Sequence, residues 1–295
     1  MYPLISVIVN CHNGEKYLKT CIESILNQKY DKFEIIFFDN FSSDNSKNII
    51  NQFNSHRIKY FFSDKKLSLY KARNEAIKKS SGSLIAFLDV DDWWDENYLE
   101  SKKNFFNENK YDFFYTNVLF FYEKKNKFIK YNRSILPNGK IFNHLANNYF
   151  IIISGLIIKK EILEKEKYFN ENYNIIGDFD LIMRISKYAT AKSFNETLVF
   201  YRVHDENFSK LNSKMYYFEY RDWYNNQKKI NDIDFQKNEE KFLLELNKLD
   251  IKHDLYHKKS LNLLIKIIRF PNSISKLKFF LAFFLPLKII NYFRK

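Results

Sequence analysis

Cysteine, glycine and proline are scarce in this chain of 295 residues, which contains 2 Cys, 5 Gly and 4 Pro. Cys11 and Cys21 are too few for a disulfide scaffold or for a zinc site with four cysteine ligands. We therefore expect buried free thiols in a reducing compartment, with a single disulfide between them as the alternative. So little glycine and proline also excludes a collagen-like or linker-rich architecture.

Long hydrophobic runs are absent as well. No stretch offers the roughly 20 uninterrupted apolar residues that a membrane-spanning helix needs. The nearest candidate, residues 279–287, is too short and contains Pro286. The first residues show neither the basic start nor the cleavage site of a signal peptide, so we expect none. Hydrophobic residues make up 45% and charged residues 28% of the chain, which argues against wholesale disorder.

Acidic residues are missing from the C-terminal part. Residues 255–295 contain nine Lys or Arg and no Asp or Glu, so this segment holds +9 of the net charge of +13. Such a tail suits nucleic acid or an anionic membrane surface. Basic and apolar residues interleave over residues 276–288, which favours an anchor at the membrane interface. The alternative is that residues 279–287 pack on the rest of the protein while the lysines are simply solvated.

Strand-like and helix-like segments alternate in the first hundred residues. Four apolar runs are typical of strands buried on both faces: residues 4–9, 34–38, 58–62 and 83–88. Apolar residues recur at helical spacing between these runs, at residues 17–26, 49–53 and 70–79. This alternation predicts a parallel α/β sheet with right-handed crossovers.

The rest of the chain is less regular. Residues 112–158 predict mixed β-structure with a hairpin tip at residues 123–127, and a further strand is expected at residues 198–203. Helices are expected at residues 97–106, 178–187 and within 215–250.

Polar residues follow three of the predicted strands, at residues 10–14, 39–44 and 89–92. Ligands bind at the carboxyl ends of the strands in sheets of this kind. Asp89 and Asp91 are one residue apart, so they can share a hard divalent cation, which in turn neutralises a diphosphate. Taken alone the pair is a weak signal, because a solvated acidic turn has the same sequence.

The combination of motifs is more specific than any one of them. It comprises residues 6–9, 13–18, 24–28, 39–44 and 72–74, then Gly82 ahead of residues 86–93, in that order. This ordered set closely resembles the nucleotide-sugar-binding half of the family 2 glycosyltransferases, which have the GT-A fold. Residues 177–184 and 201–204 resemble the family's acidic helix start and closing strand. The resemblance covers roughly residues 3–210.

This resemblance implies an α/β fold of the GT-A (Rossmann-like) type, with a mostly parallel sheet flanked by helices and a helical C-terminal extension. Residues 1–212 would form the catalytic domain, with a nucleotide-sugar-binding half at 1–110 and an acceptor-binding half at 111–212. Residues 213–295 would form the basic helical extension.

The resemblance also implies a donor site. Asp39 would accept a hydrogen bond from the base, Arg73 would lie near the nucleotide, and Asp89 would contact the ribose or the metal. The full set expected to bind the donor is Val9, Asn10, Asn13, Asp39, Arg73, Asp89 and Val90. Asp91 would ligate Mn²⁺ or Mg²⁺, and His204 falls where some members complete the metal or diphosphate site.

The catalytic base would lie at the start of the helix expected at residues 178–187. Asp178 falls at the family's base position, but the family's Glu-Asp pair is Gly177-Asp178 in this chain, so Asp180 remains the alternative. The two acids point to different sides of a helix, so only one can reach the acceptor, and Asp178 is favoured. A second departure is Phe41, which stands where the family often has a glycine after its acidic pair.

These parts imply an inverting hexosyl- or N-acetylhexosaminyltransferase. A divalent ion would act as a Lewis acid on the leaving diphosphate, and a carboxylate would take the proton of the attacking hydroxyl. The expected donor is a nucleotide sugar, with a UDP-sugar favoured. The expected acceptor is a glycan or lipid-linked acceptor of surface polysaccharide synthesis. The expected location is cytoplasmic, peripheral on the inner membrane face.

Two other classes of protein fit the sequence less well. A nucleic-acid-binding protein would use the charge of +13, but that charge crowds into one tail and no nucleic-acid module is present, so no nucleic-acid partner is expected. A metal-dependent nucleotidyltransferase also uses paired acids, but it usually has a glycine-rich phosphate loop, which this chain lacks.

Overall fold

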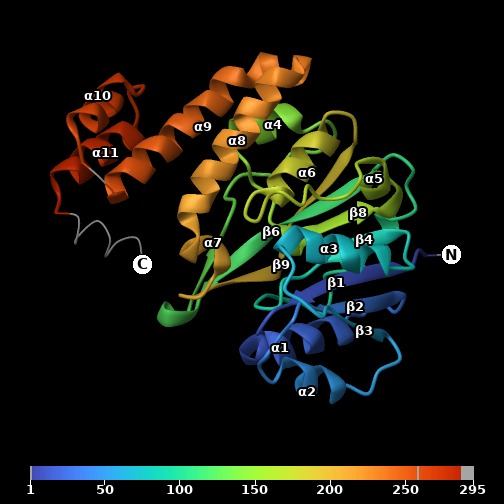
Figure 1. The fold of residues 1–295 in the computed structure, drawn as a ribbon. Helices are drawn as coiled ribbons and strands as arrows, with labels where there is room; N and C mark the ends of the chain where they lie inside the picture. Colours follow the sequence, from blue (N-terminus) through green and yellow to red (C-terminus); the bar gives the residue numbers. More distant parts are fainter. Residues whose placement is uncertain (1, 258, 287–295) are drawn as a thin grey trace. The chain divides into compact units, whose positions relative to one another are not determined.

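A computed structural model describes residues 2–257 and 259–286 of the chain. The chain divides into two compact units, Met1–His204 and Asp205–Lys295. The first unit combines a sheet with flanking helices, and the second is helical (Figure 1). The division falls slightly before residue 212, where the sequence placed the end of the catalytic domain.

One sheet organises the first unit. Its strands are β1 (Ile5–Cys11), β2 (Phe33–Asp39), β3 (Ile58–Phe62), β4 (Leu84–Phe87), β5 (Trp93–Trp94), β6 (Phe113–Tyr122), β7 (Lys127–Lys130), β8 (Leu156–Lys159) and β9 (Ala191–Val203). They follow the order β3-β2-β1-β4-β8-β6-β9-β5, and β7 pairs with β6 outside this path. Strands β1 to β4 are parallel, whereas β8 runs antiparallel to β4 and β6. The predicted α/β GT-A architecture is confirmed, with a sheet that is parallel in its first half and mixed in its second.

Helices flank this sheet on both faces. They are α1 (Glu15–Leu26), α2 (Ser46–Asn51), α3 (Leu69–Lys78), α4 (Phe142–Asn147), α5 (Lys160–Lys165) and α6 (Gly177–Ser186). Alternate residues of a strand point to opposite faces. On one face, α1 packs its buried residues Leu18 and Ile22 against Val7 and Val9 of β1. On the other face, the Phe87 ring of β4 packs on Phe169, which in turn packs on Tyr70 of α3.

Two segments differ from the sequence prediction. Residues 97–106 were expected as an α-helix, but the structure has a 3₁₀ segment at Glu100–Phe105. Strand β5 was not expected, because two residues are too few to show a periodic pattern; it pairs with β9 through Trp93 and Phe200. The expected hairpin is present: β6 and β7 are antiparallel and turn through Glu123–Lys125.

The second unit consists of α7 (Phe208–Leu211), α8 (Ser213–Ile230), α9 (Ile233–His257), α10 (Leu261–Arg269) and α11 (Ile274–Phe284). Helices α8 and α9 form an antiparallel pair, with Trp223 against Phe242 and with the Tyr217 hydroxyl 2.8 Å from Asp250. Helices α10 and α11 pack on the C-terminal half of α9. No helix among the described residues combines the length and apolar content that crossing a bilayer requires.

Candidate active site

The carboxyl ends of β1, β2 and β4 meet at one edge of the sheet, as parallel pairing requires. Cys11 of β1 pairs with Asp39 of β2, and Ile8 of β1 pairs with Phe87 of β4. The three polar segments that follow these strands therefore lie together. Most of the predicted site residues come from this edge.

The first polar segment contains the predicted residues Val9, Asn10 and Asn13. The Val9 side chain is fully buried in the core, so only its backbone is available to a ligand. Both polar atoms of the Asn10 amide are buried, and neither has a hydrogen-bond partner among the described residues. Buried amides are normally paired, so this one is suited to a ligand that supplies both a donor and an acceptor. Asn13 has a φ of 56°, and its Oδ1 accepts a hydrogen bond from the Ser43 N–H at 2.8 Å.

Asp39 is buried at the end of β2. Its two carboxylate oxygens accept from the Ser42 N–H at 2.8 Å and from the Tyr60 hydroxyl at 3.0 Å. A carboxylate has about four acceptor positions, so capacity remains for a nucleotide base. The turn after Asp39 lacks the family's glycine, yet Phe41 adopts the left-handed conformation with a φ of 64°. The substitution therefore preserves a left-handed turn at the cost of backbone strain.

Arg73 links α3 to the acidic loop that follows β4. Its guanidinium is buried and donates to Oδ1 of Asp89, the first acid of the Asp-Val-Asp segment. The guanidinium carbon also lies 5.2 Å from the centre of the Tyr70 ring. Because an arginine stays charged, this ion pair fixes the direction of the Asp89 carboxylate.

The loop after β4 packs against the end of β9. Oδ2 of Asp91 lies 2.9 Å from Nε2 of His204, and the carbonyl of Asp91 accepts from Nε of Arg202 at 3.0 Å. Asp92 is buried and accepts from the Ser154 hydroxyl and from the Arg202 N–H. Val90 between the acids packs against Gly14, where an added Cβ would lie 2.9 Å from a Val90 methyl. The structure thus brings Asp91 and His204 together from positions 113 residues apart.

These residues provide a donor set that fits a divalent cation bound with a diphosphate. Asp91 offers a carboxylate and His204 an imidazole, whereas the Asp89 carboxylate is engaged by Arg73. Within residues 2–257 and 259–286, no three His, Cys, Asp or Glu converge on one point. Mg²⁺ and Mn²⁺ do not require such a cage, because Mg²⁺ is usually held by one or two protein ligands together with waters and substrate phosphates.

The two candidate bases have different surroundings. Asp180 is buried and forms an ion pair with Arg184, whose Nε lies 3.0 Å from Oδ2 of Asp180. Arg184 also binds the Glu166 carboxylate at 2.8 Å and the Tyr168 carbonyl at 2.9 Å. Asp180 therefore belongs to a network that fastens α6 to the preceding loop.

Asp178, by contrast, faces α3. Its Oδ1 lies 3.0 Å from the Tyr70 hydroxyl. Burial raises the pKa of the Asp178 carboxyl above its usual range, and the nearby Asp89 charge acts in the same direction. Arg73, the Phe179 N–H and the Tyr70 hydroxyl oppose the rise, because each stabilises the ionised form.

Sequence reasoning missed Tyr70, Asp92 and Ser154. Tyr70 is three residues before Arg73, but no local pattern indicates its contact with Asp178. Asp92 directly follows the Asp-Val-Asp segment, and nothing in the sequence distinguishes its role from the roles of Asp89 and Asp91. The two cysteines were interpreted correctly: Cys11 and Cys21 are free and buried, and burial raises the pKa of the Cys11 thiol to about 11.

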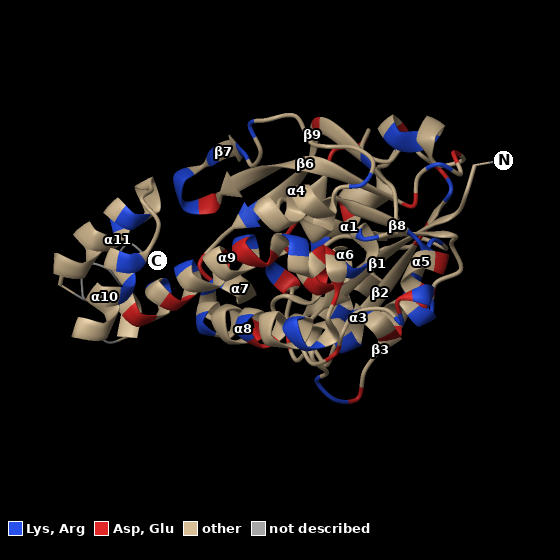
Figure 2. Cartoon of the chain, turned by 90° about the horizontal axis from the view of Figure 1, so that it is seen from above, with Lys and Arg blue, Asp and Glu red and all other residues tan. Residues whose placement is uncertain are grey.

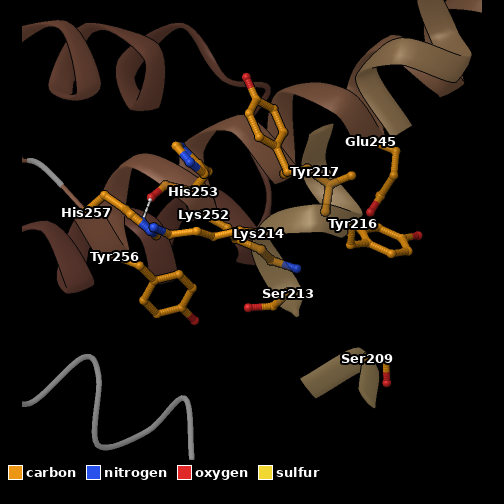
Figure 3. A pocket seen from close by; sticks show the side chains of 11 residues that line it. Ser209, Ser213, Lys214, Tyr216, Tyr217, Glu245, Lys252, His253, Tyr256 and His257 are labelled. Atoms are coloured by element: carbon orange, nitrogen blue, oxygen red, sulfur yellow. Dashed lines mark hydrogen bonds between the residues drawn. The ribbon is translucent and has the colours of Figure 1, made fainter. Parts of the chain in front are cut away.

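A cavity of about 450 Å³ lies within the second unit (Figure 3). Residues of α7, α8 and α9 line it, among them Lys214, Tyr217, Lys252 and His253. None of the predicted site residues lines this cavity, so the candidate site rests on the strand ends of the first unit.

The first unit thus has the GT-A fold, with carboxylates at the ends of its parallel strands. The model of "Glycosyl transferase family 2" matches residues 6–166, which is more than half of the chain. The chain belongs to this family.

Individual relatives agree with this assignment. The chain is 32% identical over 160 residues to UDP-Glc:alpha-D-GlcNAc-diphosphoundecaprenol beta-1,3-glucosyltransferase WfgD of Escherichia coli. That match covers 54% of this chain and 62% of WfgD, which is less than two thirds of the relative's length.

Two solved structures share the fold. TarS 1–349 of S. aureus in complex with UDP-GlcNAc has a TM-score of 0.63 at 18% identity, covering 95% of this chain and 81% of TarS. The mannosyltransferase PcManGT of Pyrobaculum calidifontis, in complex with GDP-Man and Mn²⁺, has a TM-score of 0.63 at 14% identity, covering 100% of this chain and 84% of PcManGT. At such identities the likeness establishes the fold alone.

Proposed function

We propose that this chain is an inverting glycosyltransferase. It moves a hexosyl or N-acetylhexosaminyl group from a nucleotide-diphosphate donor to a hydroxyl of a glycan or lipid-linked acceptor. The observation that supports this most is the grouping of Asp39, the Arg73–Asp89 pair, the Asp91–His204 pair and Asp178 at one end of the first unit. Each has the chemistry that one part of the reaction needs.

The donor binds at the carboxyl ends of β1, β2 and β4. Asp39 accepts a hydrogen bond from the base, and the unpartnered amide of Asn10 is available to the same nucleoside. Asp91 and His204 would hold the divalent ion, which supplies charge neutralisation to the leaving diphosphate. Arg73 fixes Asp89 beside them, so the acidic loop is ordered before the donor arrives.

Asp178 is the proposed general base. It takes the proton of the acceptor hydroxyl while the oxygen attacks C1 of the sugar, and the C1–phosphate bond breaks with its electron pair leaving on the nucleoside diphosphate. One displacement from the side opposite the leaving group inverts the anomeric centre. We favour Asp178 over Asp180 because Arg184 already neutralises Asp180.

The substrates are inferred from the relatives. WfgD is named for UDP-Glc and the TarS structure contains UDP-GlcNAc, which supports a UDP-sugar donor here; GDP-mannose, present in the PcManGT structure, is the alternative. WfgD acts on a sugar linked to diphosphoundecaprenol, which supports a lipid-linked acceptor of surface polysaccharide synthesis. A cytoplasmic location at the inner membrane face agrees with such an acceptor.

A donor panel tests the proposal directly. UDP- and GDP-sugars are incubated with the full chain, Mn²⁺ or Mg²⁺, and a synthetic sugar-diphosphate-lipid acceptor, and release of nucleoside diphosphate is measured. We expect release with one donor, dependent on the ion, and its loss in Asp89→Asn. The matched control is Asp64→Asn, an exposed acid after β3 that should not change the rate. If no donor released nucleoside diphosphate, the result would contradict the proposed activity.

A further inference from the structure

Helices α10 and α11 have apolar side chains on two faces. The inner face packs on α9: Leu263 and Ile267 of α10 and Phe279 of α11 are buried together with Ile251 and Leu255 of α9. This packing accounts for the position of both helices within the second unit.

The opposite face is exposed to solvent. It consists of Leu261, Ile265 and Ile268 on α10 and of Ile274, Leu277, Leu281 and Phe284 on α11. Their spacing of three or four residues places them along one side of each helix. Ile274 is 75% exposed and Leu277 is 60% exposed, so neither is covered by its neighbours. We call these seven side chains the outer face.

We propose that the outer face is a membrane-docking surface that inserts into the interface of a lipid bilayer. A helix on the surface of a globular protein normally has a polar side toward water, whereas the solvent-facing side of these two is largely apolar. Helices α10 and α11 contain no acidic residue, so every charged position on them is basic (Figure 2). An apolar stripe with basic flanks is the pattern of helices that lie in the interface plane of anionic membranes.

The contacts of the lysines indicate whether electrostatic attraction to headgroups or apolar insertion would hold the outer face to lipid. Lys266 lies 2.7 Å from both Asp250 and Asp254 of α9. Lys259 donates to the carbonyls of Ala282 and Phe283 near the end of α11. These lysines therefore stabilise the helices and are not available to lipid headgroups.

Few basic groups are left to face the membrane. Lys276 donates to the Ile268 carbonyl at 2.7 Å, joining the two helices. In the part of the chain that the structure describes, exposed Arg269 and Lys278 make no ion pair. Lys258 and residues 287–295, which the sequence analysis counted in the basic tail, lie outside the described residues. Insertion of apolar side chains should therefore contribute most of the free energy of membrane binding, and charge should contribute less.

The experiment is co-sedimentation of the full chain with vesicles of phosphatidylcholine alone and of phosphatidylcholine with phosphatidylglycerol. The test variant is Leu277→Ser with Leu281→Ser. The matched control is Ile230→Ser with Ile233→Ser, which removes two residues that are 64% and 66% exposed beside the α8–α9 turn. We expect the wild type and the control to bind both vesicles and the test variant to lose at least tenfold in binding.

Salt and a fluorescence probe separate the alternatives. At about 1 M salt the Debye length falls to about 3 Å, so headgroup attraction is screened while apolar insertion persists. Leu281→Trp should show a blue-shifted emission when vesicles are added, and this reading does not depend on the serine variant remaining folded. Binding that salt abolishes, or a test variant that binds like wild type, would overturn the proposal.

A second copy of the chain is the competing occupant of the outer face. Sedimentation equilibrium measures this: a wild-type dimer that the double serine variant converts to a monomer, without vesicle binding, would assign the face to self-association instead. The proposal does not depend on glycosyl transfer, because vesicle binding is measured without substrates.

Discussion

The hydroxyl oxygen of Tyr70 on α3 lies 3.0 Å from Oδ1 of Asp178 at the start of α6. The Tyr70 ring also fills the space beside Gly177, where an added Cβ would overlap it. The pair therefore explains two features at once: the direction of the proposed base, and the glycine that stands where the family has a glutamate.

The Tyr70 hydroxyl has one proton and two acceptors within reach, Asp178 and the carbonyl of Ile175 at 3.1 Å. Tyr70→Phe removes a donor from the ionised carboxylate, so the pKa of Asp178 should rise further. The acid side of the kcat/KM profile should move to higher pH, and the neutral rate should fall roughly three- to tenfold, which matches one hydrogen bond. A pH–rate profile measures both.

Tyr131→Phe is the control for this variant. The charge of Asp178 contributes to the raised pKa of the Tyr131 hydroxyl, but the hydroxyl contacts the Tyr149 carbonyl at 3.5 Å and not Asp178. Its profile should match that of wild type. An acid limb that Tyr70→Phe leaves in place would show that the hydroxyl does not act on the base.

Asp178→Asn retains the shape of the side chain and removes the proton acceptor. We expect donor affinity to persist and turnover to fall roughly 10²- to 10⁴-fold, the usual share of general base catalysis. Asp180→Asn should instead weaken the ion pair with Arg184, lowering the melting temperature with turnover retained at low temperature. Calorimetry and single-turnover rates distinguish the two. Loss of turnover in Asp180→Asn alone would exchange the assignments.

Asp91→Ala removes the carboxylate that faces His204 at 2.9 Å. Since a protein ligand and the diphosphate are expected to share the ion, affinity for UDP should lose its dependence on Mn²⁺. Titration calorimetry with UDP, with and without Mn²⁺, measures this difference. Asp64→Asn provides the comparison, and an Asp91→Ala protein whose affinity still depends on Mn²⁺ would remove Asp91 from the metal site.

Gly177→Ala tests the packing of Tyr70. The new Cβ would lie 2.5 Å from Cε2 of Tyr70, so the ring or α6 must shift, at a cost of roughly 1–3 kcal/mol. Gly155→Ala is the control, because its nearest contact, at 3.1 Å, is a methyl of Thr116. Denaturant unfolding should show a smaller loss for Gly155→Ala. Adding Tyr70→Ala should remove most of the penalty at 177, and a penalty that persists would place the strain elsewhere.

The sequence was most informative where a local pattern matched a structural rule. The apolar runs of β1, β2 and β4 predict parallel strands, and the structure shows them buried on both faces. Because the carboxyl ends of parallel strands meet at one edge, this pattern was enough to predict that Asp39 and Asp89 lie there. The motif order then related Asp91 to His204, which only the folded chain brings into contact.

Other features depend on partners remote in sequence. The choice between Asp178 and Asp180 depends on Arg184, whose other acidic partner is Glu166, and on Tyr70, which is 108 residues before Asp178. No periodic pattern in the sequence predicts either contact. The interpretation of the basic tail changed for the same reason: Lys266 has acidic partners on α9, outside the acid-free segment.

The raised pKa of Asp178 also has a consequence for stability. A group whose pKa is higher in the folded state prefers to be protonated there, so its favourable contribution is complete below the unfolded pKa and is lost as pH rises through the folded pKa. At neutral pH the ionised carboxylate therefore destabilises the fold, because burial outweighs the help of Arg73 and Tyr70.

Asn resembles the protonated acid and has no such dependence. Asp178→Asn should melt above wild type at neutral pH, and the difference should vanish below the pKa of an unfolded aspartate, about 3.9. Thermal melts across this range measure it. A variant that melts below wild type at neutral pH would mean that the ionised carboxylate is stabilised in the fold, and that the site does not trade stability for a base at this position.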